Sequence, residues 1–154
     1  MSSLLISGAH ILDPASGFDG EGHVGIRDGK IVQVGKTKPK FKYSDTLHAK
    51  GLWLIPGIVD LAARLREPGQ TAKATIASEA RAALASGITT VVLPPDTSPV
   101  IDTPGVVDRI RMKSEAAGLD VRMLGALTKG LSGEALAEMG ALKQAGCVGV
   151  SNAH

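Results

Sequence analysis

The residues that could carry chemistry are concentrated in one stretch, Leu54–Gly69, whose central part, Ile58–Leu65, we expect to be a buried strand that runs into a polar turn. Successive side chains of a strand point to opposite faces, so Asp60, Arg64 and Arg66 are expected on one face. Two guanidinium groups could bind an anion there. Neither can bind a metal, because a guanidinium is a permanent cation without a lone pair to donate.

The residues before this stretch have the pattern of a small antiparallel β unit. We expect strands at about 2–12, 23–34 and 46–49, the middle segment being a hairpin. That hairpin contains Asp28-Gly29 between alternating polar and apolar residues, which is typical of a two-residue turn. We therefore expect a β-sandwich-like unit at residues 1–53 and a second unit at residues 54–154.

The second unit alternates between apolar segments and segments of helical pattern. Strands are expected at 58–65, 88–93, 121–127 and 146–151, with helices at about 73–86, 104–117 and 133–145. This alternation predicts a parallel sheet with right-handed crossovers. The sheet is either open and doubly wound or part of a (β/α)8 barrel, which needs about 250 residues when complete. Half a barrel leaves parallel strand edges unpaired, so another segment must complete it, or the chain is part of a longer protein.

Composition argues against several classes of function. Aromatic residues make up only 3% of the chain, which leaves no stacking surface for single-stranded nucleic acid. No apolar run approaches the roughly 20 residues that span a bilayer. Cys147 is the only cysteine, so a reducing cytoplasm is the expected location. The basic run Lys36–Lys42 is either a solvated loop or a contact for phosphate or an acidic partner.

Several linked motifs resemble those of the dihydroorotase family of amidohydrolases. The family signature Pro-Gly-x-x-Asp-x-His-x-His-Leu-Arg-Glu-Pro-Gly matches residues 56–69 except at its two histidines. The family's Gly-x-Thr-Thr-Val-Val matches residues 87–92, and its Met-Pro-Asn-Thr-x-Pro-Val corresponds to Pro-Pro-Asp-Thr-Ser-Pro-Val at 94–100. The resemblance implies an α/β fold: a small antiparallel β unit followed by the first four βα units of a (β/α)8 amidohydrolase barrel, incomplete in this chain.

The resemblance also implies that a metal site has been lost. The family's two zinc-binding histidines correspond to Ala62 and Arg64, and the aspartates that end its fourth strand correspond to Asn152 and Ala153. Zinc in this chemistry lowers the pKa of a bound water and so generates the nucleophile. With these four positions substituted, we expect no metal, no cofactor and no catalytic residue in this chain.

Two positions of the family's substrate site are recognisable and are interpreted as vestigial. Arg66 corresponds to the arginine that grips the substrate carboxylate, and Asp96 replaces a substrate-binding asparagine with a carboxylate that would repel an anion. We further hypothesise that Arg64 occupies the vacated metal volume and is partly compensated by Asp60. The alternative is that Arg64 extends into water without a fixed partner.

These substitutions resemble the pseudo-dihydroorotases, inactive homologues that serve as structural partners of aspartate transcarbamoylase. The sequence therefore predicts a catalytically inactive, cytoplasmic protein of pyrimidine biosynthesis that works in an oligomeric assembly with such a subunit and binds neither nucleic acid nor membrane. The alternative is an active metal-dependent dihydroorotase, or a related cyclic amidohydrolase acting on amide C–N bonds, with atypical metal ligands.

Overall fold

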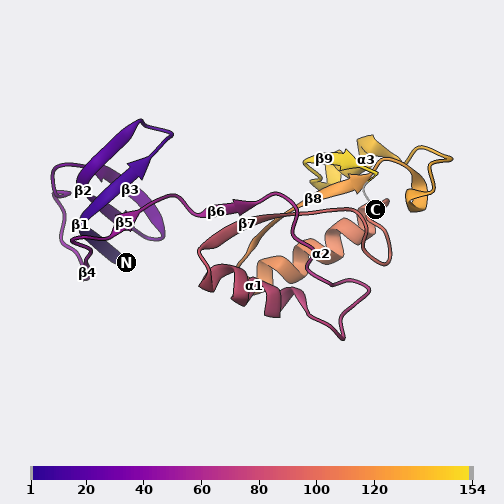
Figure 1. The fold of residues 1–154 in the computed structure, drawn as a ribbon, viewed down its shortest axis with the longest axis horizontal. Helices are drawn as coiled ribbons and strands as arrows, with labels where there is room; N and C mark the ends of the chain where they lie inside the picture. The colour runs from indigo at the N-terminus through magenta and orange to yellow at the C-terminus, as the bar shows by residue number, and fades with distance from the viewer. Residues whose placement is uncertain (1, 153–154) are drawn as a thin grey trace. The chain divides into compact units, whose positions relative to one another are not determined.

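The computed structural model of the protein describes residues 2–152, and the chain divides into two compact units between Pro56 and Gly57. The first unit consists of strands, and the second alternates strands with helices (Figure 1). In the part of the chain that the structure describes, no helix combines the length and apolar character needed to cross a membrane.

The first unit is a five-stranded sheet formed by β1 (Ser3–Asp13), β2 (Phe18–Arg27), β3 (Lys30–Gly35), β4 (Asp45–His48) and β5 (Trp53–Leu54). The order is β3-β2-β1-β4, and β5 also pairs with β1. The predicted hairpin turn is confirmed, because Asp28 and Gly29 separate β2 from β3 with φ values of 49° and 75°. Strands β4 and β5 run parallel to β1, so the sheet is mixed and not wholly antiparallel as expected.

The two faces of this sheet differ in what covers them. Residues 36–44, between β3 and β4, place Pro39 and Phe41 against Gly25 of β2. The other face carries an apolar groove of about 430 Å³, whose lining includes Val24 and Leu54. The segment after β3 thus returns the chain across one face before it enters β4, which explains why β4 can run parallel to β1.

The second unit is a four-stranded parallel sheet in the order β6-β7-β8-β9. Its elements are β6 (Ile58–Asp60), α1 (Ile76–Ala85), β7 (Ile88–Leu93), α2 (Pro104–Ala117), β8 (Asp120–Ala126), α3 (Met139–Ala145) and β9 (Gly149–Ser151). A short 3-10 turn, η1 (Lys129–Leu131), follows β8. Neighbouring strands follow one another in sequence without the order reversal of a doubly wound sheet, so the topology is that of a barrel segment.

Helices α1 and α2 cover one face of this sheet (Figure 1). The core between them holds Val91, Leu93 and Met123 from the strands and Ile76 and Ile110 from the helices, each at most 3% exposed. The opposite face is open in the described chain, and Val59 of β6 is 52% exposed. Burial of one face and exposure of the other is what a segment of a barrel wall requires.

Two elements differ from the sequence prediction because local turns take residues assigned to them. Strand β6 ends at Asp60, whereas the pattern predicted a strand to residue 65. Helix α3 begins at Met139, six residues later than expected, since Gly133 is left-handed at φ 81° and Thr128 bridges Leu136. After β6 the turn is closed by the Asp60 carboxylate, which accepts the Ala62 N–H, and before α3 it is formed at Gly133, a residue that adopts a positive φ without strain.

We expect Gly57→Ala to destabilise the second unit. A β-carbon at residue 57 would lie 2.1 Å from Thr89 Oγ1 and 2.8 Å from Thr89 Cβ, and the latter cannot move away without the β7 backbone. Overpacking of this kind costs about 1–3 kcal/mol. The measurement is urea unfolding followed by circular dichroism at the helical band, since all described helices lie in this unit.

Gly105→Ala is the matched control. Residue 105 lies in the first turn of α2, and an added β-carbon there meets nothing within 4 Å. Alanine should stabilise the helix by about 0.5–1 kcal/mol, because glycine loses more backbone entropy on folding. Equal effects of the two substitutions would contradict the steric explanation for Gly57.

Candidate functional site

The four parallel strands of the second unit end at one edge of the sheet, and active sites of barrel folds form at that edge. The segments that follow β6, β7, β8 and β9 begin at residues 61, 94, 127 and 152. Every candidate position from the sequence that lies in the described chain belongs to β6 or to these segments. The site is therefore built from the strand ends and their connecting loops.

The chain turns immediately after β6. The Asp60 carboxylate accepts a hydrogen bond from the Ala62 backbone N–H at 2.9 Å, and the Ala63 N–H donates to the Val92 carbonyl at 3.1 Å. Asp60 is the register partner of Val91, which is buried under the helices, so Asp60 lies on the helix-covered face. The expected alternation of side chains from Asp60 to Arg66 on one strand face is therefore wrong.

Arg64 is paired with Asp96 and not with Asp60 as hypothesised. Arg64 Nε donates to Asp96 Oδ2 at 2.7 Å, and the two side chains are 43% and 20% exposed. Asp96 follows β7, the strand adjacent to β6, whereas the Asp60 carboxylate is already used by the turn. The ion pair thus joins two neighbouring strand ends at positions where the dihydroorotase signature has a histidine and an asparagine.

A cavity of about 180 Å³ lies beside this ion pair. Its lining includes Arg64, Arg66, Gln70 and Ser98. Arg66 is exposed, and within residues 2–152 its guanidinium has no hydrogen-bond or ion-pair partner. The cavity therefore offers one free cation next to a neutralised one, which suits a small anion better than a metal ion.

The loop that carries Arg66 packs tightly against the loop after β7. Gly69 has a φ of 109°, and a β-carbon there would lie 2.6 Å from Ser98 Cβ. The Ser98 N–H also donates to the Pro68 carbonyl at 3.3 Å. This close approach requires glycine at residue 69 and holds the cavity walls in place.

Glu67 anchors the same loop to both helices. Its side chain is 6% exposed, and its carboxylate accepts hydrogen bonds from the Ile76 N–H at 2.8 Å and from the Lys113 ammonium. The hydrogen bond from Lys113 lowers the pKa of Glu67 below its usual value of 4.5, and the Ile76 N–H adds to this, while burial opposes it. A carboxylate at the first turn of α1 is also favoured by the helix dipole.

Asn152, the first residue after β9, is held by the neighbouring strand end. Its Oδ1 accepts hydrogen bonds from Thr128 Oγ1 at 2.7 Å and from the Thr128 N–H at 3.3 Å. Thr128 Oγ1 in turn accepts from the Gly133 N–H at 3.0 Å. Ala153, the other substituted position here, lies outside the described residues.

The side chains at the family's metal positions do not fit zinc. Zinc in proteins is bound by imidazole, thiolate or carboxylate, whereas Ala62 has no donor atom and Arg64 is an ion-paired cation. The amide oxygen of Asn152 is engaged by Thr128. Across residues 2–152 no three His, Cys, Asp or Glu side chains are grouped so that they could hold a metal ion.

Sequence reasoning retained Glu67 as a residue that the turn needs for its shape, but it missed Lys113 and Thr128, which organise this edge as the partners of Glu67 and Asn152. Lys113 lies 46 residues from Glu67, and Thr128 lies 24 residues from Asn152, so no local pattern connects them.

Comparison with known proteins identifies close relatives that are much longer. Residues 51–154 match the family model described as dihydro-orotase-like. The chain is 45% identical over 150 residues to a dihydroorotase of Anaeromyxobacter dehalogenans strain 2CP-C and 44% identical over 151 residues to a dihydroorotase-like protein of Pseudomonas aeruginosa. Both alignments cover 97% of this chain, but only 35% and 36% of those relatives, so the chain spans about a third of their length.

Among solved structures, the L-hydantoinase of Arthrobacter aurescens superposes with a TM-score of 0.82. The match covers 97% of this chain and 32% of that structure at 20% identity, so it bears on the fold alone. It confirms the predicted fold class, a β unit followed by the first part of an amidohydrolase barrel, with the barrel incomplete in this chain.

Replacing Glu67 by glutamine should lower the stability of the second unit by about 2 kcal/mol at pH 7, because it removes the charge from a hydrogen-bonded buried carboxylate. The Glu67 pKa is lower in the folded than in the unfolded state, so its contribution is present above the unfolded value of 4.5 and is lost as the pH falls through the folded value. The difference in the free energy of unfolding between the parent and Glu67→Gln should therefore become smaller below pH 4.5. Urea unfolding at several pH values measures this difference.

Glu134→Gln serves as the control, since Glu134 is exposed. This substitution should change the free energy of unfolding by no more than about 0.5 kcal/mol at every pH. If the difference in the free energy of unfolding between the parent and Glu67→Gln did not change with pH, the role assigned to the Glu67 carboxylate would be contradicted.

Proposed function

The chain belongs to the dihydro-orotase-like family, and we propose that it is a catalytically inactive, dihydroorotase-like protein of pyrimidine biosynthesis with a structural role in an assembly with aspartate transcarbamoylase. The observation that carries the proposal is the Arg64–Asp96 ion pair. It lies at two positions of the family signature that serve, in the active enzymes the sequence resembles, as metal ligand and substrate contact.

The ion pair supports inactivity more strongly than either substitution alone. An isolated arginine at a metal position would leave an uncompensated cation, and an isolated Asp96 would leave a carboxylate facing an anionic substrate. Together the two side chains satisfy each other, so the site is stable without a metal. Asn152 is satisfied separately by Thr128 at the other end of the strand row.

The structural role is supported by what the chain has retained. The core between sheet and helices is closely packed, and the Arg-Glu-Pro-Gly turn is fixed by Glu67 and by the approach of Gly69 to Ser98. A protein that uses the fold as a scaffold needs these features and does not need the metal ligands. The partner follows from the resemblance of the Pro-Pro-Asp-Thr motif at residues 94–97 to the pseudo-dihydroorotases.

The first test is chemical. Purified protein should contain far less than one zinc per chain by elemental mass spectrometry, and should hydrolyse dihydroorotate at least roughly 1,000-fold more slowly than the Anaeromyxobacter relative assayed in parallel, since no metal-activated water is formed. Stoichiometric zinc together with turnover comparable to that relative would establish the alternative, an active amidohydrolase with atypical ligands.

The second test concerns the assembly. Co-expression with aspartate transcarbamoylase of the same organism should yield a complex of defined mass by native mass spectrometry. Asp96→Asn in this protein should leave that complex intact, because the ion pair belongs to the vestigial site. Separate migration of the two proteins at micromolar concentration would refute the structural role.

A further inference from the structure

The basic run of the first unit has an alternating structure that the proposed function does not explain. Lysines occupy every second position, at residues 36, 38, 40 and 42, and all four are exposed. The positions between them hold Thr37, Pro39 and Phe41, followed by Tyr43, and Pro39 and Phe41 make contacts to the sheet at Gly25. We name the four lysines the lysine stripe.

The intervening residues fix the stripe on the sheet. Pro39 is buried, and a β-carbon on Gly25 of β2 would lie 2.6 Å from its Cγ and 3.1 Å from Phe41 Cε1. The guanidinium of Arg27 stacks 4.3 Å from the centre of the Phe41 ring. Phe41 and Tyr43 pack edge to face with ring centres 4.9 Å apart.

Hydrogen bonds hold both ends of the segment. Gln33 Nε2 donates to the Thr37 carbonyl at 3.1 Å, and Ser3 Oγ donates to the Lys42 carbonyl at 3.2 Å. The Tyr43 hydroxyl donates to the Pro39 carbonyl between them. The stripe is therefore presented by an ordered backbone, and less conformational entropy is lost when it binds a partner.

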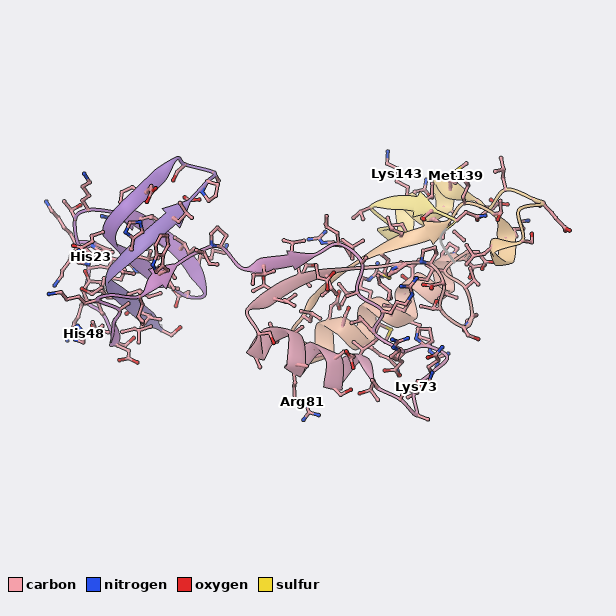
Figure 2. All side chains as sticks on the ribbon, viewed as in Figure 1. His23, His48, Lys73, Arg81, Met139 and Lys143 are labelled. Atoms are coloured by element: carbon pink, nitrogen blue, oxygen red, sulfur yellow. The ribbon has the colours of Figure 1, made fainter. Side chains whose placement is uncertain are left out.

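The charge of the stripe is not compensated by an ion pair in the described part of the chain. Residues 29–44 contain no acidic side chain, and within residues 2–152 none of the four lysines forms an ion pair. His23 and His48 (labelled in Figure 2) are both register partners of Ser7, and His23 is two residues from Gly25 on β2, so the register assigns both histidines to the face that carries Gly25. Four like charges on one ordered segment repel one another, and an acidic partner would relieve this repulsion.

We infer that the lysine stripe is a docking surface for an acidic patch on a protein partner. This inference rests on the proposed function, because the partner is the proposed aspartate transcarbamoylase subunit. Single-stranded nucleic acid fits less well, since the Phe41 ring packs against Arg27 and Tyr43 packs against Phe41, so both rings already have partners within the chain.

The experiment compares two charge-matched double variants of the full protein. Lys38→Glu/Lys40→Glu reverses the middle of the stripe, and Lys73→Glu/Arg81→Glu makes the same change in net charge on exposed residues of the second unit, which Figure 2 shows pointing outward. Dissociation constants with the aspartate transcarbamoylase of the same organism are measured by calorimetry at 50, 150 and 300 mM NaCl. Thermal unfolding verifies that each variant is folded.

At 50 mM NaCl the dissociation constant of the stripe variant should be higher than that of the parent by about 10-fold or more, and that of the control variant should lie within about 2-fold of the parent. At 300 mM NaCl the difference in dissociation constant between the stripe variant and the parent should be smaller, because salt screens exposed charges. If the parent forms the complex and the stripe variant binds with the same dissociation constant, the inferred docking surface is wrong and the proposed function is unaffected. Absence of any complex with the parent overturns both.

Two further probes separate other anionic partners from an acidic protein. A 20-nucleotide polyuridine and vesicles containing phosphatidylserine are titrated against the parent at 150 mM NaCl. Weak binding of both, relative to the protein partner, supports the inference. Tighter binding of either one, abolished by Lys38→Glu/Lys40→Glu, would assign the stripe to nucleic acid or to a membrane surface and overturn the inference.

Discussion

The buried carboxylate of Glu67 connects the strand-exit turn to the two helices that cover the sheet. One oxygen accepts the Ile76 N–H where α1 begins, and the other accepts the Lys113 ammonium from α2. A buried carboxylate without partners would be strongly unfavourable, so these two contacts determine where the loop, α1 and α2 meet. The positions of Arg64 and Arg66 at the sheet edge follow from this anchor, since both lie within three residues of it.

The edge itself is organised by contacts between neighbouring strand ends. Arg64 after β6 pairs with Asp96 after β7, and Asn152 after β9 accepts hydrogen bonds from Thr128 after β8. A metal-dependent site would instead direct its ligands at one central ion. In this chain the same edge is stabilised by pairwise contacts along the sheet. In each pair, the side chain at a substituted family position contacts a residue that follows the adjacent strand.

The two units carry different kinds of surface. In the described part of the second unit the polar groups of the sheet edge are mostly satisfied internally, and Arg66, beside a cavity of about 180 Å³, has no hydrogen-bond or ion-pair partner among residues 2–152. In the first unit the lysine stripe is held by Pro39 and Phe41, and its lysines form no ion pair with any other residue that the structure describes. This contrast is consistent with our two proposals, that the retained family site is vestigial and that a protein partner binds the lysine stripe.

The amino-acid pattern by itself determined the sequence of strands and helices in the second unit, the Asp28-Gly29 turn and the family, because hydrophobic periodicity, turn residues and linked motifs are local signals. It also identified the positions without metal donors, since that depends only on side-chain chemistry. Only the tertiary structure decided that Arg64 pairs with Asp96, that β6 stops at Asp60 and that β4 runs parallel to β1. The Arg64–Asp96 pair and the direction of β4 join residues far apart in the chain, which no spacing rule within one segment can predict. The end of β6 depends on a contact between the Asp60 carboxylate and the Ala62 N–H, which the apolar pattern of residues 58–65 does not reveal.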